Sequence, residues 1–314
     1  MPNPSHMKFD VPHQIFAHRR PGAALVCFGL LLFHFGNAAH SESVAKIVAV
    51  PAPPATLVCV VSGEGDDLSE MSMDPVVIVQ GGKLKPVYPE YNEAAQQLFA
   101  KQYFPPGQKY RLTFGGGDAG TATVKKSDKG CNALHAIVAV ETTAKIHGQV
   151  VALATNSESL GRKASARRAP TDEERASILA MVKQIYRSRR TPPQLLRLLQ
   201  TTNLTATDLN DDGKFELIGS FVIQTPAKMR RELFLIAEMR GNSFAAALVS
   251  YQFYKLPPEG FDSAIRFADQ LDLDGDGVAE VFAIAGGFDG YSYLIYKKQN
   301  GRWRNVYSAM GDVC

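Results

Sequence analysis

Short runs of β-branched and aromatic residues alternate with turn residues over most of the chain, a pattern typical of strands. The first cluster of runs predicts five strands, at Thr56–Val61, Pro75–Val79, Lys109–Phe114, Leu134–Thr142 and Gln149–Ala154. Between them, apolar residues at helical spacing predict one helix over Asn92–Phe104, which Pro105 ends. We therefore expect an α+β domain over residues 56–156.

A glycine-rich segment, Gly115–Gly120, separates two strand-like runs. Such a segment can bind phosphate when a helix follows it and a Lys-Ser/Thr pair closes the loop. Neither feature follows the glycines here, so we interpret the segment as a hairpin turn.

The chain changes character at residues 157–200, which we expect to form a basic helical connector. Thr171 and Glu174 have the spacing of a capping box at the start of a helix, and Pro192 marks the start of a second, shorter helix. Residues 162–197 hold ten Lys and Arg against three acidic residues. A solvated helical face explains this bias, and weak contact with an anionic surface is the alternative.

Strand patterns return after this connector and predict a β module over residues 201–314. The predicted strands are Phe215–Ile223, Glu232–Glu238, Phe244–Phe253, Ala264–Asp269, Glu280–Ala285, Tyr291–Lys297 and Trp303–Tyr307. The expected fold class is mainly β with a helical connector.

The N-terminus has the pattern of a secretory signal peptide. Two arginines at positions 19 and 20 precede an apolar run over residues 23–35, and small residues follow up to Ala39. The run is shorter than the ~20 residues of a membrane-spanning helix, so we expect cleavage and export to the periplasm or the exterior. Residues 40–55, which are polar and then rich in Pro and Ala, are expected to form an extended leader.

Composition and charge exclude several classes of protein. Hydrophobic residues make up 45% and charged residues 21% of the chain, as in globular proteins and unlike disordered ones. Removing residues 1–39 takes away three basic residues and one acidic residue, which leaves a net charge of +1. We therefore expect no nucleic-acid partner, and no transmembrane segment after signal cleavage.

Three cysteines remain after removal of the signal peptide. Cys59 and Cys131 are the natural pair for one disulfide in an oxidising compartment, because both lie in strand-like parts of one segment. The alternative, of equal weight, is that both are reduced and buried. Cys314 is expected to be a free thiol.

Two segments of the β module repeat each other and fit the pattern D-x-[DN]-x-D-G-x-x-E, each followed at once by an apolar strand. The oxygen-bearing side chains are Asp208, Asn210, Asp212 and Glu216 in the first segment and Asp272, Asp274, Asp276 and Glu280 in the second.

Oxygen atoms in this spacing suit calcium, a hard cation that takes about six to eight oxygen ligands. Alternate residues of a tight loop converge on one point only if the chain can reverse, and Gly213 and Gly277 at position 6 allow this. The backbone carbonyl groups of Lys214 and Val278, at position 7, are expected to add a ligand each.

Two other interpretations of the segments are weaker. An EF-hand needs a bidentate Glu at position 12, where this chain has Gly219 and Ala283 within strand-forming runs. Asp, Asn and Gly are also common in ordinary turns, but two copies would place carboxylates together that repel without a cation.

The two segments resemble the loops of FG-GAP/VCBS repeats, the β-propeller blades of integrin α-chains and of many bacterial surface proteins. The resemblance covers about residues 201–310, and residues 293–303 also look like the inner hairpin of a blade. It implies antiparallel blade-like sheets, with calcium bound by the eight side chains named above. Because a closed propeller needs at least four blades, an open pair is expected, whose edges the helices of 171–200 or the N-terminal domain would cover.

No catalytic motif is recognised: Gly-x-Ser-x-Gly, His-Glu-x-x-His and Cys-x-x-Cys are all missing from the chain. We therefore expect a calcium-binding, non-catalytic binding or structural protein of the envelope or exterior, with an unknown protein or carbohydrate ligand. The alternative is a hydrolase or lyase of envelope polymers, which needs convergent carboxylates outside the loops. The candidates are Glu64, Asp66, Asp67, Asp118 and Glu141. Trp303 and several tyrosines are either a sugar-stacking platform or core residues, and core is favoured.

Overall fold

The structure, a computed structural model, describes residues 55–63, 67–88, 92–144, 150–256, 264–287 and 290–313. The predicted signal peptide lies outside these ranges, as does the predicted leader apart from Ala55. Within them, no helix has both the length and the apolar character that a membrane span requires.

The first half of the chain forms an antiparallel sheet that closes on itself, here called the closed sheet. The strand order is β1-β7-β4-β5-β6-β2-β3, and a further pairing of β1 with β2 joins six of the strands into a ring. The strands are β1 (Thr56–Gly63), β2 (Met71–Gln80), β3 (Lys83–Lys85), β4 (Lys109–Phe114), β5 (Gly117–Lys129), β6 (Leu134–Thr142) and β7 (Val150–Thr155).

Successive side chains of β1 contribute alternately to two hydrophobic cores, one on each face of the closed sheet. Leu57, Cys59 and Val61 belong to the interior core of the ring, while Val58 and Val60 belong to a second core outside it. Helix α1 (Glu93–Tyr103), capped by the Asn92 side chain, adds Phe99 and Tyr103 to the interior core.

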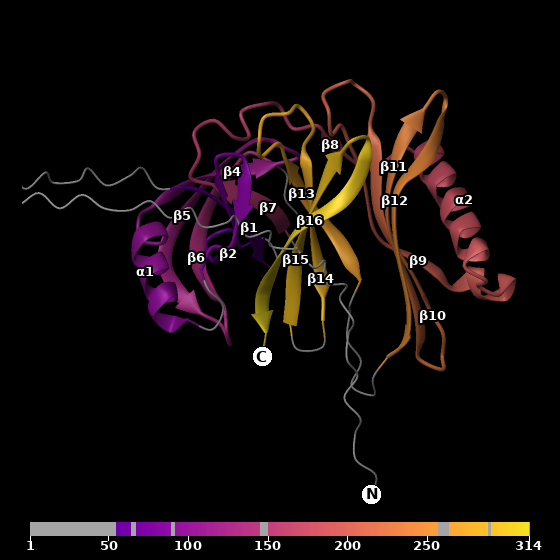
Figure 1. Ribbon diagram of the computed structural model, residues 1–314, viewed down its shortest axis with the longest axis horizontal. Helices are drawn as coiled ribbons and strands as arrows, with labels where there is room; N and C mark the ends of the chain where they lie inside the picture. The colour runs from indigo at the N-terminus through magenta and orange to yellow at the C-terminus, as the bar shows by residue number, and fades with distance from the viewer. Residues whose placement is uncertain are drawn as a thin grey trace, which may run out of the picture. The chain divides into compact units, whose positions relative to one another are not determined.

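The second half forms two further antiparallel sheets, each a simple succession of neighbouring strands. The first open sheet contains β8 (Arg167–Arg168), β9 (Leu199–Thr207), β10 (Glu216–Gln224), β11 (Met229–Arg240) and β12 (Ser243–Lys255). The second open sheet contains β13 (Ile265–Leu271), β14 (Glu280–Gly286), β15 (Gly290–Gln299) and β16 (Arg302–Val313). Both are drawn in Figure 1 in orange to yellow.

The second open sheet has apolar side chains on both faces. Along β14, Val281 and Ala283 join a core with the first open sheet, whereas Phe282 joins the core that contains Val58 and Val60 of the closed sheet. The second open sheet therefore lies between the first open sheet and the closed sheet, the order seen in Figure 1.

The other face of the first open sheet is covered by helix α2 (Asp172–Ser188) and the 3-10 helix η1 (Pro193–Leu198). The predicted capping box is confirmed, because Thr171 and Glu174 exchange both of its hydrogen bonds. Ile178 and Val182 of α2 pack on Leu217, which β10 presents to this side. The helical connector and the N-terminal strands thus cover the faces of the two open sheets rather than their edges, which differs from the expectation.

The expected fold class, mainly β with a helical connector, is confirmed. Four strands are missed by the sequence pattern: β3, β5, the two-residue β8 and β9. β9 is rich in Thr and half exposed, so it lacks the apolar alternation that predicts a strand. Gly115 and Gly116 form the turn between β4 and β5, with Phe114 paired with Gly117, whereas the rest of the predicted turn, Gly117–Gly120, belongs to β5.

The predicted disulfide between Cys59 and Cys131 is wrong. Cys59 is a free, fully buried thiol in the core of the closed sheet, and this burial raises its pKa. Cys131 is disulfide-bonded, and Cys59 is not its partner.

Candidate metal centre

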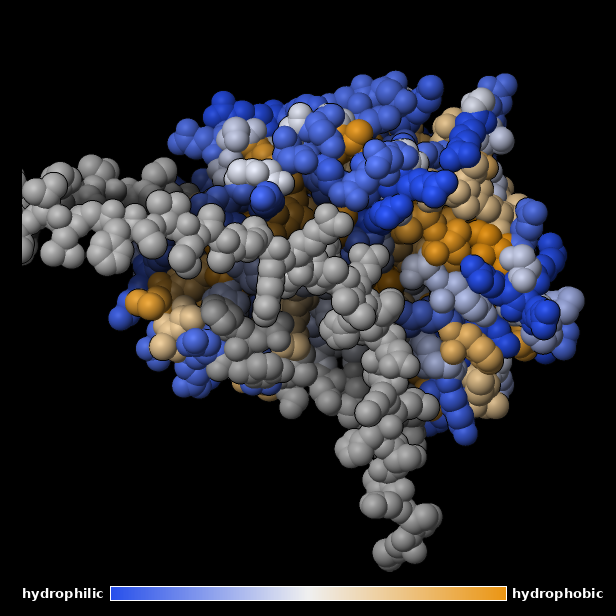
Figure 2. Space-filling view, viewed as in Figure 1, coloured by the Kyte–Doolittle hydropathy of each residue, from blue (hydrophilic) through white to orange (hydrophobic). Residues whose placement is uncertain are grey.

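The two repeated segments form loops at equivalent places in the two open sheets. The first loop, residues 208–216, joins β9 to β10, and the second loop, residues 272–280, joins β13 to β14. Figure 1 places both loops at the upper end of the sheets, and Figure 2 shows mostly hydrophilic residues along this edge. The sequence repeat is therefore also a repeat of position in the fold.

The same three hydrogen bonds fix both loops, each from a backbone N–H to a side-chain carboxylate. In the first loop the N–H groups of Gly213, Lys214 and Leu209 donate to Asp208, Asp212 and Glu216 at 2.8, 2.8 and 2.9 Å. In the second loop the N–H groups of Gly277, Val278 and Leu273 donate to Asp272, Asp276 and Glu280 at 3.0, 2.9 and 2.8 Å. The carboxylates at positions 1, 5 and 9 therefore face the inside of each loop.

Backbone conformation also repeats between the loops. Gly213 and Gly277 at position 6 have φ values of 77° and 86°, the left-handed region that glycine adopts without strain. Position 4 is left-handed as well, with φ of 56° at Asp211 and 76° at Gly275. The glycine at position 6 is visible in the sequence pattern of both segments, whereas position 4 is Asp in one and Gly in the other and so gives no pattern.

The loops touch each other directly. The N–H of Ala279 in the second loop donates to the carbonyl oxygen of Leu209 in the first loop at 2.7 Å. A small cavity of ≈ 40 Å³ lies beside this contact, with Lys163 in its lining, and the Lys163 ammonium group pairs with Asp211. A change in the conformation of one loop can therefore affect the other.

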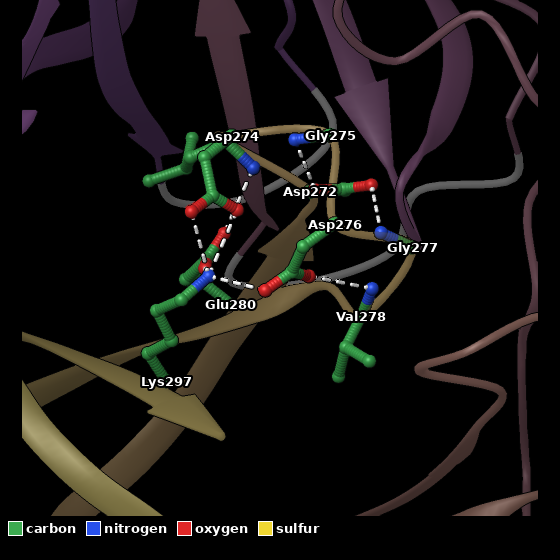
Figure 3. A network of polar contacts seen from close by, with 9 residues as sticks. Asp272, Asp274, Gly275, Asp276, Gly277, Val278, Glu280 and Lys297 are labelled. Atoms are coloured by element: carbon green, nitrogen blue, oxygen red, sulfur yellow. Dashed lines mark hydrogen bonds and ion pairs between the residues drawn. The ribbon is translucent and has the colours of Figure 1, made fainter. Parts of the chain in front are cut away.

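In the second loop, a lysine side chain lies among the carboxylates. The ammonium group of Lys297, from β15, donates to Asp274 at 2.8 and 2.9 Å, to Asp276 at 2.7 Å and to Glu280 at 2.6 Å (Figure 3). Partial burial opposes the charge on Lys297, but these hydrogen bonds together raise its pKa. The second loop thus already contains a cation supplied by the chain.

One carboxylate oxygen from each of Asp272, Asp274 and Asp276 lies within 4.8 Å of the others. In the described parts of the chain no other three His, Cys, Asp or Glu side chains come together in this way, those of the first loop included. Glu280 is buried beside them, and burial raises its pKa, an effect that Lys297 partly offsets.

The first loop lacks such a cation. Among the described residues, no lysine or arginine pairs with Asp208, Asp212 or Glu216, and Lys163 pairs with Asp211 at position 4 instead. Burial raises the pKa of Glu216 to about 7, and the charges of Asp208 and Asp212 add to this effect. The first loop therefore holds three carboxylates without a basic hydrogen-bond partner among the described residues, although the charge of Lys163 acts on Asp208 through space.

The side-chain amide of Asn210 lies within the same group. One end of it is 3.1 Å from Oδ1 of Asp208 and 3.2 Å from Oδ1 of Asp212. With the NH₂ group turned inward, the amide donates to both carboxylates. With its oxygen turned inward, it adds a third oxygen to the group, an arrangement that a cation would stabilise.

Strand register explains why the loops differ in charge. Val281 pairs with Tyr296, so the preceding residue, Glu280, lies opposite Lys297. In the first open sheet Leu217 pairs with Ala237, which places Glu238 at the position equivalent to Lys297. Glu238 instead accepts hydrogen bonds from Trp303 and Lys298 of the second open sheet, at 2.7 and 2.8 Å.

The donor set of the first loop fits calcium. Three carboxylates and one amide are hard oxygen donors, no sulfur or imidazole is present, and loop position 7 can add a backbone carbonyl. The second loop has four carboxylates at the equivalent positions, but calcium can use them only if the Lys297 ammonium group moves away.

The other sequence candidates that the structure describes do not form a metal-binding or catalytic group of three. Glu64 and Asp66 lie outside the described residues, Asp118 forms an ion pair with Arg111 at 2.8 Å, and Asp67 accepts from the N–H of Ser69. Glu141 lies exposed on β6. In the described ranges these side chains do not form a carboxylate group of three.

The aromatic and basic candidates are largely used inside the fold. Trp303, Tyr293 and Tyr296 are buried, so they contribute to cores rather than to a flat sugar platform. Of the basic connector, Arg168 pairs with Glu174 at 2.7 Å and Arg167 lies over the rings of Phe114 and Phe267.

The chain matches no family model, and its comparison with curated proteins and with solved structures finds no similar protein. The resemblance to FG-GAP/VCBS repeats therefore stays a prediction that rests on the residues of the two loops.

Proposed function

We propose that this chain is an exported calcium-binding protein with a binding or structural role in the cell envelope or exterior, and that the first loop is its principal calcium site. The observation that carries the proposal is the repeated loop. Two segments in different sheets share one hydrogen-bond pattern, and one of them carries Asp208, Asp212 and Glu216 without a lysine or arginine ion pair in the described residues. Its ligand would be an unidentified protein or carbohydrate.

Calcium in this position would act as a clamp. The first loop continues directly into β10, which packs on α2 from one face and on the second open sheet from the other. Because Leu209 accepts a hydrogen bond from Ala279, ordering the first loop would also hold the second. Extracellular calcium modules bind with dissociation constants of about 10⁻⁴ to 10⁻³ M. Millimolar calcium would then add roughly 0.5 to 1.5 kcal/mol per site.

The second loop is proposed as the weaker site. Calcium there must displace an ammonium group that already contacts Asp274, Asp276 and Glu280, so part of its binding free energy is lost. Lys297 therefore makes the second loop less dependent on calcium than the first.

Thermal unfolding with calcium and with chelator tests the proposal, using a matched pair of variants at position 5. Calcium should raise the melting temperature of the wild type by a few degrees, roughly 2–4 °C per kcal/mol. Asp212→Ala should lose this gain, and Asp276→Ala should keep most of it. An unchanged melting temperature of the wild type would count against calcium binding, and loss of the gain only in Asp276→Ala would reverse the order of the two sites.

A further inference from the structure

A second candidate site lies far from the loops along the sheets, between the closed sheet and the second open sheet. A cavity of ≈ 100 Å³ is lined by residues of β2, β15 and β16 and of the segment after β3. Its lining includes Asp74, Tyr291, Tyr293 and Asp312. Neither loop contributes a residue to it.

Asp74 is the chemical centre of this cavity. It is only 8% exposed, yet it belongs to a β2 segment whose other residues are mostly apolar. Its Oδ2 atom accepts hydrogen bonds from the hydroxyl groups of Tyr291 at 2.5 Å and Tyr293 at 2.6 Å, and its Oδ1 atom from Ser72 at 2.9 Å. Three uncharged hydroxyl groups thus donate hydrogen bonds to a carboxylate that is buried from water.

The charge of Asp74 lacks a counter-ion within the described part of the chain. No lysine, arginine or histidine is among the described residues that line the cavity, and Asp74 forms no ion pair with any of them. A second carboxylate, Asp312, also faces the cavity, where it accepts from the backbone N–H groups of residues 131–133. Because the charge of His135 reaches Asp312, the carboxylate without a basic neighbour is Asp74. Burying an unpaired charge is costly unless a cation is near.

The remaining walls favour an organic cation over a hydrated metal ion. Four tyrosines and a larger number of aliphatic residues form them, and the rings of Tyr291 and Tyr293 meet edge to face at a centroid distance of 5.5 Å. Aromatic rings attract cations through their faces, and an ammonium group with methyl substituents gains both this attraction and apolar contact. The volume admits a head group and not a drug-sized molecule.

We propose that this cavity binds the head group of a small organic ammonium ion, held by the charge of Asp74 and by the surrounding tyrosine rings. The proposal goes beyond calcium binding and does not depend on it, since the cavity and the loops share no residue. The ligand class of this cavity would then be small organic ammonium ions of the cell envelope or exterior.

The test uses tetramethylammonium as the probe and tert-butanol as its neutral counterpart of similar size. Ligand-observed NMR titrations of the full chain, in chelator and at constant ionic strength, compare the two dissociation constants. Saturable binding of tetramethylammonium is expected, at least about tenfold tighter than that of tert-butanol, because only the ion can use the charge of Asp74.

Three variants locate the binding. Asp74→Asn removes the charge and should weaken binding of the ion at least about tenfold. Glu70→Gln removes one charge from an exposed side chain nearby in sequence and should leave binding unchanged. Tyr291→Leu, which removes a ring and leaves Asp74 in place, should also weaken binding, and it replaces Asp74→Asn if that variant does not fold.

Each other result overturns the proposal. Absence of saturable binding to the folded wild type shows that the cavity takes no ammonium ion. Equal affinity for the ion and for tert-butanol shows that its charge does not select the ligand. Unchanged binding in both Asp74→Asn and Tyr291→Leu places the bound ion elsewhere on the protein.

Discussion

The ammonium group of Lys297 lies 2.6 Å from the carboxylate of Glu280, opposite it on the neighbouring strand. Glu280 is the last oxygen-bearing residue of the second loop, and its side chain is only 2% exposed. The equivalent residue of the first loop, Glu216, has no such partner among the described residues. The same motif therefore has a basic partner for its glutamate in the second loop and, among the described residues, none in the first.

Replacing Lys297 tests what its ammonium group does for the second loop. Lys297→Met keeps the apolar part of the side chain but leaves Asp274, Asp276 and Glu280 without a cation. We expect the free energy of unfolding in chelator to fall by about 1–3 kcal/mol, because the variant loses hydrogen bonds between charged groups at a partly buried site. Denaturant unfolding in chelator measures this change.

The matched control for that variant is Lys125→Met. Lys125 pairs only at 3.8 Å with the exposed carboxylate of Glu70, so this change should stay within about 0.5 kcal/mol of the wild type. Calcium should recover more stability in Lys297→Met than in the wild type. Equal losses in the two variants would show that Lys297 is an ordinary surface lysine.

The pKa of Glu216 predicts a pH dependence of the calcium-free protein. In the folded state the pKa is raised to about 7 from the ordinary value of 4.5, because burial and the charges of Asp208 and Asp212 disfavour the ionised form. The folded state then holds a proton that the unfolded state releases, so the contribution of Glu216 is fully present below pH 4.5 and is lost as pH rises through 7.

Unfolding of the wild type and of Glu216→Gln in chelator, from pH 4.5 to pH 8, measures this contribution. The stability of the wild type relative to the variant should fall across the window, and millimolar calcium should reverse the fall because it favours the ionised carboxylate. A stability difference that is constant with pH would contradict the raised pKa.

The cysteines give a prediction that needs no variant. Asp312 accepts hydrogen bonds from the backbone N–H groups of Cys131 and Asn132, at 3.0 and 2.9 Å, so this part of β16 lies beside Cys131. Cys314 follows Asp312 by two residues, and Cys59 is free. Peptide mapping without reduction should therefore find a Cys131–Cys314 disulfide and an unreacted Cys59, and a peptide linking Cys59 to either cysteine would contradict it.

Those parts of the candidate site whose residues lie close together in the sequence could be predicted from it. Asp208 and Gly213 belong to one short segment, so their relationship is visible in the spacing of residue types, and the structure keeps it. Lys297 was missed because it comes from another strand, and its place opposite Glu280 depends on the register of the β14–β15 hairpin. Aligning the strands that follow the two loops would have placed Lys297 and Glu238 at equivalent positions.

The fold shows the same division between local and long-range information. The capping box at Thr171 was predicted because both of its residues lie within one turn of α2. The closing of the first sheet depends on pairing between β1 and β7, residues such as Val60 and Leu153 that are far apart in the chain. No local pattern reports such a pairing, and the same holds for the contact between Ala279 and Leu209.

Equilibrium binding of calcium to the wild type, Asp212→Ala and Lys297→Met tests the central claim most directly. With radioactive calcium and dialysis, the wild type should bind one ion per chain with a dissociation constant of about 10⁻⁴ to 10⁻³ M. Asp212→Ala should lose this ion, and Lys297→Met should bind a second. A wild type that binds no calcium in this range, or that keeps its ion in Asp212→Ala, would contradict the assignment of the first loop as the calcium site.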